Sequence, residues 1–246
     1  MSNGAPATRA RIGLIIPTSN RLSEEQFNRC APEGVHIHTT RLRMTGPNRI
    51  QPRDLPREVT YAAGLLADAK CDVIVFHCTG SSMEAGFEGE QRIVEEMASA
   101  TGRRATSTAS ALVEALHAVE ARRLALISPY ASNEHEVTFL RAAGFEVVRD
   151  RAAALPGSDA FVTTPSSFWV DATEHEADPL VDAYLLSCTN IRSIEVIADL
   201  EQRLGRPVIT SNQATLWYCL RVCGLMDVIP GLGRLFTLTH PAAVPA

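Results

Sequence analysis

The sequence predicts an α/β protein of two similar lobes, in which parallel sheets are flanked by helices and a pseudo-twofold axis relates the lobes across a cleft. Short aliphatic runs of strand type alternate with segments of helical period along the 246 residues. The order of these segments in the first half returns in the second half, which indicates a duplicated unit. The recurring landmarks, offset by 112, 110 and 104 positions, are Ile12 and Leu124, Cys78 and Cys188, and Ser107 and Ser211.

The repeat divides the chain into two lobes of ordinary domain size. We expect a loose tail over residues 1–10, a first lobe formed by residues 11–117 together with 216–246, and a second lobe over residues 118–215. Strands that alternate with helices form parallel sheets, and such sheets bind ligands at the carboxyl ends of their strands. The cleft between the lobes is therefore the predicted active site.

The composition argues against several classes of function. A formal net charge of −5, with 21% charged residues, gives no basic footprint for nucleic acid or an anionic membrane. The first residues are polar, and no run approaches the roughly 20 apolar residues of a membrane helix. We therefore expect a cytoplasmic protein whose six cysteines are reduced thiols. Small anionic molecules stay open as ligands, because a binding site is local.

The first elements follow from hydrophobic period. Residues 11–17 form a continuous apolar run that ends in a turn, as in a strand buried on both faces. Ser23 before two glutamates indicates the start of a helix. Residues 35–40 alternate as a strand with His36 and His38 on one face, which we interpret as a solvated face because no third metal ligand is nearby.

A crossover unit follows. Residues 55–70 have helical spacing and lead into a β-branched strand, residues 72–77, that ends at a cysteine. Residues 89–98 form an amphipathic helix, and residues 105–108 are expected to open a further helix over 109–116. This completes the first copy.

The second copy repeats the plan. Residues 122–128 restart with a strand followed by a proline, and Asn133 is the expected cap of a helix over 134–143. The segment 156–167 is rich in Pro, Ser and Thr and predicts a loop. The remaining expected elements are strands at 145–149, 182–187 and 207–210 and helices at 191–204 and 212–223.

Two cysteines occupy equivalent places in the two copies. Cys78 and Cys188 each follow a strand, and each is followed by a threonine. The start of the next helix can make such a thiol more acidic, and a substrate carbon between two thiols could gain a proton from one and lose it to the other. A lone free cysteine is usually a small core residue, but two in equivalent turns favour catalysis.

Neutral donors at the same strand ends could hold a substrate carboxylate without an arginine, although each could also be a simple cap. His77 should point to the opposite face of its strand from Cys78 and is interpreted as packing. No cysteine or histidine set completes a metal site, so we expect no metal. The candidate substrate-binding residues are Thr18, Asn20, Thr79, Gly80, Tyr130, Thr189 and Asn190.

These residues resemble the aspartate/glutamate racemase superfamily and, within it, the branch of maleate cis-trans isomerases and arylmalonate decarboxylases. The resemblance implies two α/β lobes around a cleft, cofactor-free chemistry and small carboxylate substrates, and a homodimer is plausible by analogy. The local matches span nearly the whole chain and are Ile15–Asn20, Thr40–Met44, Cys78–Gly80, Ser128–Tyr130 and Ser187–Cys188 with Leu200–Thr210.

The resemblance also implies roles. In maleate isomerases the first cysteine adds to the double bond, the resulting single bond rotates, and the thiol is eliminated while the second cysteine handles the proton. Cys78 would then be the nucleophile, Cys188 the acid and base, and Asn20 and Tyr130 contacts of the substrate carboxylates. In arylmalonate decarboxylases the first position is glycine and the second cysteine protonates an enediolate, with Thr79 and Tyr130 as donors. The cysteine at position 78 therefore favours an isomerase or racemase.

One departure from the family pattern concerns the second lobe. Isomerases usually carry an asparagine there that contacts the far carboxylate, whereas residues 161–169 offer hydroxyl and aromatic side chains. Three alternatives to a maleate-type isomerase stay open. They are a two-cysteine racemase, an arylmalonate-type decarboxylase, and a carboxylate-binding relic of the fold without turnover.

Overall fold

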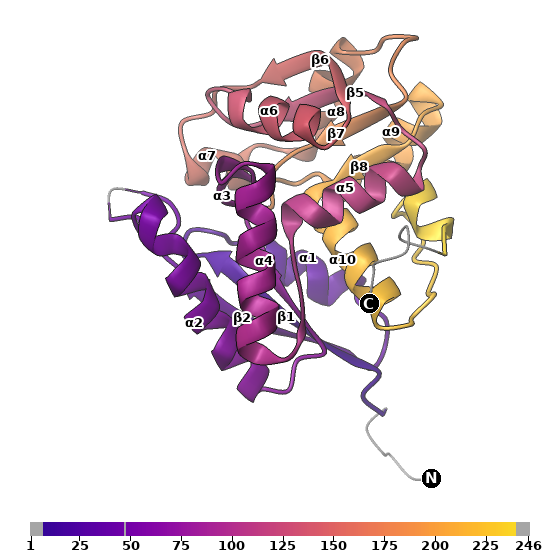
Figure 1. Ribbon diagram of the computed structural model, residues 1–246. Coiled ribbons are helices and arrows are strands. Elements are labelled where there is room, and N and C mark those ends of the chain that lie inside the picture. Colours follow the sequence, from indigo (N-terminus) through magenta and orange to yellow (C-terminus); the bar gives the residue numbers. More distant parts are fainter. Residues whose placement is uncertain (1–6, 47, 240–246) are drawn as a thin grey trace.

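Two four-stranded parallel sheets form the framework of the protein (Figure 1). The computed structural model describes residues 7–46 and 48–239. The sheets have equivalent strand orders, β2-β1-β3-β4 and β6-β5-β7-β8. The strands are β1 Ala10–Pro17, β2 Val35–Leu42, β3 Val73–Phe76, β4 Arg104–Ser107, β5 Arg123–Ser128, β6 Glu146–Ala152, β7 Ala183–Leu186 and β8 Val208–Thr210.

Helices flank both sheets, and α2 and α4 lie side by side against the first one (Figure 1). The helices are α1 Ser23–Cys30, α2 Leu55–Asp68, α3 Thr79–Glu84, α4 Phe87–Thr101, α5 Thr108–Ala118, α6 Glu134–Ala142, α7 Ser158–Thr163, α8 Ser166–His175, α9 Ile197–Leu204 and α10 Ser211–Val222. Short 3₁₀ turns cover η1 Pro52–Asp54, η2 Ile194–Val196 and η3 Arg234–Thr237.

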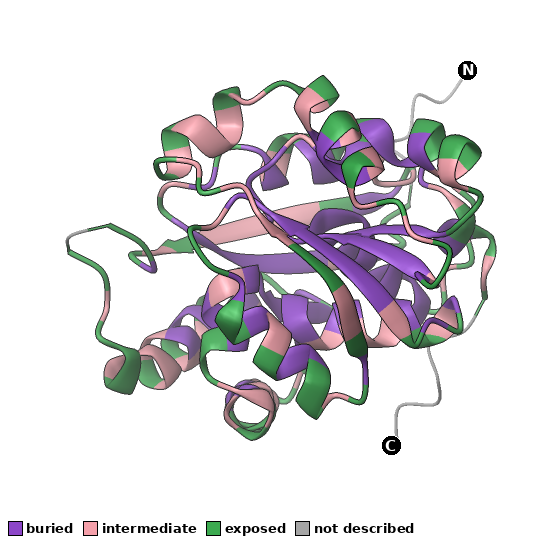
Figure 2. Ribbon diagram, turned by 90° about the horizontal axis from the view of Figure 1, so that it is seen from above, coloured by how far each residue is buried: buried purple, intermediate pink, exposed green. Residues whose placement is uncertain are grey.

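The internal repeat is visible in the strand register. In the first sheet Ile12 pairs with Val73 at the start of β3, and in the second Leu124 pairs with Ala183 at the start of β7. Each central pair of strands is buried on both faces, as the continuous apolar runs predict (Figure 2). The predicted fold class, two similar α/β lobes with parallel sheets, is confirmed.

One predicted element is wrong and another is right only in part. Residues 105–108 do open a helix, since Ser107 Oγ accepts from Ser110 N (3.0 Å) to cap α5 and Thr108 is its first residue, but Ala105 to Ser107 also belong to β4 of the first sheet. Residues 156–167 are not a loop: they contain α7 and the start of α8, separated at Pro165. Trp169, with none of its surface exposed, anchors α8 in the core.

Smaller differences concern helix starts. Ser23 is the first residue of α1 rather than its cap, because Asn20 Oδ1 accepts from the backbone N–H of Leu22 (3.1 Å) and Ser23 (3.0 Å). Asn133 stands at the cap position of α6 but uses its side chain on Ser128 and Asp150 instead. The predicted helix over 191–204 begins only after a short turn and η2.

The division of the chain into a tail and two lobes stays a prediction. Residues 1–6 of the predicted tail lie outside the described residues, while Arg9 forms an ion pair with Asp227 (2.7 Å) and Ala10 already belongs to β1. Helix α10 follows the second sheet and packs against α5 and α1 of the first half. Within the described part of the chain, no helix has the length and apolar character to cross a membrane.

Candidate active site

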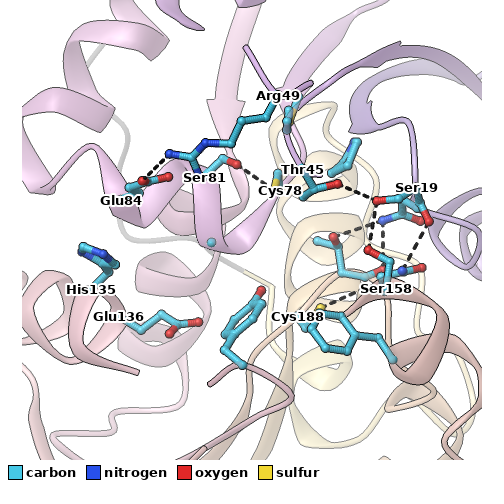
Figure 3. Close-up of a pocket in the computed structure, with 18 of the residues that line it drawn as sticks. Ser19, Thr45, Arg49, Cys78, Ser81, Glu84, His135, Glu136, Ser158 and Cys188 are labelled. Carbon is cyan, nitrogen blue, oxygen red and sulfur yellow. Dashed lines mark hydrogen bonds and ion pairs between the residues drawn. The ribbon is translucent and has the colours of Figure 1, made fainter. Parts of the chain in front are cut away.

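A cavity of about 370 Å³ opens where the carboxyl ends of the strands of both sheets meet (Figure 3). Its lining includes the turns after the four central strands, represented by Asn20 after β1, Cys78 after β3, Tyr130 after β5 and Cys188 after β7. Parallel sheets place such turns together, so residues far apart in the sequence share one site. The two predicted thiols therefore line the same cavity.

Cys78 links β3 to α3. It has extended backbone at the cap position of α3, and 7% of its surface is exposed. Its sulfur lies 3.2 Å from Ser81 Oγ. Burial raises the pKa of the Cys78 thiol, while hydrogen bonds from the side chain and backbone of Ser81 oppose that shift.

Cys188 has the equivalent place after β7, with 4% of its surface exposed. The Cys188 sulfur accepts a hydrogen bond from Asn190 N (3.3 Å). The backbone N–H of Cys188 donates to Ser211 Oγ (3.1 Å). Burial raises the pKa of Cys188 to about 12, against the lowering effect of hydrogen bonds from Asn190 N and the Tyr130 hydroxyl. The expectation of more acidic thiols is therefore wrong for both cysteines, because desolvation outweighs the helix starts.

The Tyr130 hydroxyl interacts electrostatically with both thiols. Burial raises its pKa well above the ordinary tyrosine value, and the charge of a Cys188 thiolate would raise it further. The phenol is thus a neutral donor that hydrogen-bonds Cys188. Its ring meets Phe161 edge-on at 5.9 Å, and a side chain at Gly80 would lie 3.6 Å from its hydroxyl. This is an ordinary van der Waals distance, so α3 packs beside the tyrosine and a methyl group at position 80 would fit there.

Asn20, Thr189 and Asn190 line the cavity as predicted and also join the two halves of the molecule. Asn20 Nδ2 donates to Thr189 O (3.2 Å) and Oγ1 (3.1 Å), and Asn190 Oδ1 accepts from Arg21 N (2.9 Å). The Asn20 amide also donates to Ser23 Oγ (2.9 Å). The carboxamide of Asn20 is therefore committed to protein partners in this structure.

Two predicted contact residues lie away from the cavity lining. Thr18 is exposed, and its backbone N–H donates to Leu42 O (2.9 Å). Thr79 is buried, and its Oγ1 donates to Ser211 Oγ (2.9 Å), which also receives the Cys188 N–H. Thr79 thus connects the two cysteine turns through Ser211 instead of facing a substrate.

His77 lies outside the cavity, on the opposite face of its strand end from Cys78. It is completely buried, its Nε2 donates to Asn212 Oδ1 (3.0 Å), and its Nδ1 lies 3.0 Å from Thr108 Oγ1. Burial lowers the pKa of His77 to about 3, so the ring is neutral. The packing interpretation of this histidine is confirmed.

Further polar groups lie at the ends of the cavity, and apart from Ser19, a hydroxyl at the end of the first strand, they were not identified from the sequence. A chain of hydroxyls runs from Thr45 Oγ1 to Ser19 Oγ (2.8 Å) and on to Ser158 Oγ (3.1 Å). At the other end lie Arg49 and three side chains of α3 and α6, and Figure 3 shows them together. These are Glu84, His135 and Glu136.

Glu136 has the most perturbed acidity of that group. Only 3% of its surface is exposed, and its Oε1 accepts from Ser187 Oγ (3.0 Å), the residue before Cys188. Burial raises the pKa of Glu136 to about 8. A glutamate in an amphipathic helix gives no sequence signal of burial, which is why it was missed. Across the described residues, no group of three or more His, Cys, Asp and Glu side chains is arranged to hold a metal ion.

The family model for arylmalonate decarboxylase matches residues 12–236, almost the entire described chain. This protein belongs to that family. The resemblance to the branch of maleate isomerases and arylmalonate decarboxylases is thereby confirmed. The maleate isomerase of Nocardia farcinica is 32% identical over 96% of this chain and 98% of its own length, and the arylmalonate decarboxylase of Bordetella bronchiseptica is 31% identical over 94% and 98%.

Solved structures agree with this membership. The maleate isomerase Iso of Pseudomonas putida S16, as a Cys→Ala variant with maleate, has a TM-score of 0.86 at 26% identity and covers 93% of this chain and 97% of that one. Arylmalonate decarboxylase has a TM-score of 0.83 at 27% identity, with 92% and 98% covered. A Cys→Ser variant of the Nocardia farcinica isomerase, with a covalently bound succinylcysteine intermediate, has a TM-score of 0.84 at 26% identity over 93% and 98%.

Proposed function

We propose that this protein is a cofactor-independent cis-trans isomerase of a small unsaturated dicarboxylate of the maleate type. The observation that carries the proposal is the presence of two thiols, Cys78 and Cys188, in one cavity. Protonation of an enediolate, the last step of a decarboxylation, needs one acid. Addition of a thiolate to a double bond with separate proton handling uses both. The maleate isomerases among the relatives support the same chemistry.

In the proposed reaction, the fraction of the protein in which Cys78 has released its proton to solvent is the reactive form, and its thiolate adds to one alkene carbon. The electron pair of the double bond moves to the neighbouring carbon, which takes a proton from Cys188. Rotation about the new single bond converts the cis into the trans arrangement. The Cys188 thiolate then removes the proton, the double bond forms again, and Cys78 leaves as a thiolate. Both residues return to their starting states, and no other reactant is consumed.

The pKa shifts determine when this cycle can begin. Burial raises the pKa of both thiols, so at neutral pH Cys188 holds the proton that it must donate. Hydrogen bonds oppose the shift at both sulfurs, from Ser81 at Cys78 and from Asn190 N and the Tyr130 hydroxyl at Cys188. The Tyr130 hydroxyl would stabilise the Cys188 thiolate after proton transfer. We assign the nucleophile to Cys78 by its resemblance to the first cysteine of the maleate isomerases.

A second function, decarboxylation of a substituted malonate, is favoured by the aromatic side of the cavity. Phe161 and Tyr130 pack edge-on in the lining, where an aryl substituent could contact them. In that reaction Cys188 would protonate the carbon and Cys78 would have no role. The two functions therefore differ in their dependence on Cys78.

Proton NMR of the reduced protein with maleate in deuterated buffer tests the proposal. Fumarate should appear with the wild type and fall by about 100-fold or more with Cys78→Ala and with Cys188→Ala. Cys30→Ala is the matched control, because Cys30 does not line the cavity. If maleate stays unchanged while an arylmalonate loses carbon dioxide in the Cys78→Ala variant, the decarboxylase function replaces the isomerase.

A further inference from the structure

We propose that Arg49 gives the site its preference for a second carboxylate, by exchanging its partner Glu84 for the distal acid group of the substrate. The proposal rests on the proposed function in one respect, namely that the substrate is a small carboxylate. It adds a residue of the first half that selects a dicarboxylate over a monocarboxylate.

The donors expected to hold the carboxylates are largely engaged. Asn20 donates to Thr189 and Ser23, and Asn190 Nδ2 donates to Ser19 O (3.5 Å). The segment after β6 brings the hydroxyl of Ser158 and the ring of Phe161 to the cavity, and both are uncharged. A substrate with two negative charges therefore lacks a charged partner among these groups.

Arg49 is the one arginine or lysine among the described residues that line the cavity. Figure 3 shows its side chain extending over Ser81 and past Cys78 to reach Glu84. Cys78 stands at the cap position of α3 and Glu84 is its last residue, six positions or about 9 Å of helix further on. Arg49 and Cys78 line the same cavity, so a substrate that reaches the sulfur shares this cavity with the arginine side chain.

The ion pair that holds Arg49 is weak enough to exchange. Nη2 of Arg49 lies 3.1 Å from Oε1 of Glu84, and the two side chains are 42% and 36% exposed. Ion pairs with this exposure contribute little to stability, whereas a guanidinium can bind a carboxylate through two parallel hydrogen bonds. A substrate carboxylate that is shielded from water in the cavity therefore competes well with Glu84.

The charges around Glu84 define an alternative arrangement, in which Glu84 and not Arg49 binds the ligand. His135 and Glu136 lie at the same end of the cavity, and Figure 3 shows all three side chains close to one another. Burial raises the pKa of Glu136 to about 8, and Glu84 is the carboxylate that forms the ion pair with Arg49. If Glu84 were itself the ligand-binding group, the site would take an ammonium instead of a second acid.

Calorimetric titration with succinate and with butyrate tests the exchange, because neither ligand has a double bond and both bind without reacting. Arg49→Gln should weaken succinate binding about 10- to 100-fold and change butyrate binding less than about threefold. Arg49→Lys should give an intermediate loss, since lysine keeps the charge without the planar fork. Glu84→Gln should strengthen succinate binding by freeing Arg49, and Arg53→Gln, an exposed neighbour, should leave both affinities unchanged.

Three results would overturn the exchange. They are equal losses for both ligands with Arg49→Gln, a loss of succinate affinity with Glu84→Gln, and no binding of succinate to the wild type at millimolar concentration. Tighter binding of aspartate than of succinate, abolished by Glu84→Gln, would assign the ammonium arrangement instead. These titrations do not involve turnover, so a protein that discriminates succinate through Arg49 but leaves maleate unchanged would refute the proposed function alone.

Discussion

At the residue scale, burial controls the acidity of the site more than any charged neighbour does. Desolvation is the largest cause of the pKa shifts of Cys78, Cys188, Tyr130 and Glu136. All four groups are therefore protonated at neutral pH in the free protein, and the cavity carries less negative charge than its composition suggests. A dianionic substrate meets neutral donors there, which favours its entry.

Glu136 gives the clearest stability prediction. Its pKa is about 8 in the folded protein against an ordinary value of 4.5, so folding retains a proton that the unfolded chain loses above pH 4.5. This contribution to stability is complete below about pH 4.5 and declines as the pH rises to about 8, by roughly 1.4 kcal/mol per pH unit. The contribution of His77 to stability has the opposite pH dependence, because its pKa falls from the ordinary 6.5 to about 3 on folding. This contribution changes only below about pH 6.5, since above that value the ring is neutral in both states.

Glu136→Gln should therefore abolish most of the loss of stability between pH 6.5 and pH 8, since glutamine keeps the hydrogen bond from Ser187 without titrating. Urea unfolding of both proteins at several pH values in this window measures the effect. Glu134→Gln, on the same helix but exposed, is the control. Parallel pH profiles of Glu136→Gln and wild type would show that Glu136 titrates normally.

At the element scale, Ser211 at the start of α10 forms hydrogen bonds to both cysteine turns. Its Oγ accepts both from Thr79 Oγ1 (2.9 Å), at the start of α3, and from Cys188 N (3.1 Å). Removing a buried acceptor leaves two donors without this partner. The position of both thiols therefore depends on a residue that touches neither sulfur.

We expect Ser211→Ala to lose roughly 1–3 kcal/mol of unfolding free energy and to lower kcat more than it raises KM, because the turns shift while the carboxylate contacts remain. Urea unfolding and steady-state kinetics separate the two effects. Ser167→Ala, on the exposed face of α8, should change neither. Loss of stability with unaltered kcat would limit Ser211 to a structural role.

At the scale of the whole molecule, polar side chains connect the two sheets across the cavity. Asn20 reaches Thr189 from the first half, and Asn190 reaches Arg21 from the second. The proposed substrate site is thus a seam whose halves are held together by direct hydrogen bonds. Such preorganisation reduces the free energy that substrate binding would have to supply to order the site.

Asn20→Ala should lose roughly 1–3 kcal/mol of stability, because Asn20 both caps α1 and joins the two halves. Asn20→Asp keeps the acceptor that caps α1 but loses the donors to Thr189 and adds a negative charge at the cavity. It should be more stable than the alanine variant and yet have a higher KM for a dicarboxylate. Equal stability of the two variants would contradict the capping role.

The sequence predicted the framework well and the ends of the cavity poorly, for physical reasons. Continuous apolar runs and the duplicated order define the central strands, and strand ends place Cys78 and Cys188 together. The helices within residues 156–175 were missed because short helices interrupted by Pro165 carry little period. Arg49 and Glu136 were missed because their roles depend on which distant element covers them, which local pattern does not encode.

The most direct test of the central claim is the intact mass of the Cys188→Ser variant after incubation with maleate. The proposed mechanism predicts a mass increase of one substrate, located on Cys78 by peptide mapping. In this variant the carbon next to the new C–S bond takes its proton from solvent, while elimination, which needs the Cys188 thiolate as base, is slowed. The same treatment of Cys78→Ser should leave its mass unchanged. Absence of the adduct in Cys188→Ser, with isomerisation present in the wild type, would contradict covalent addition by Cys78.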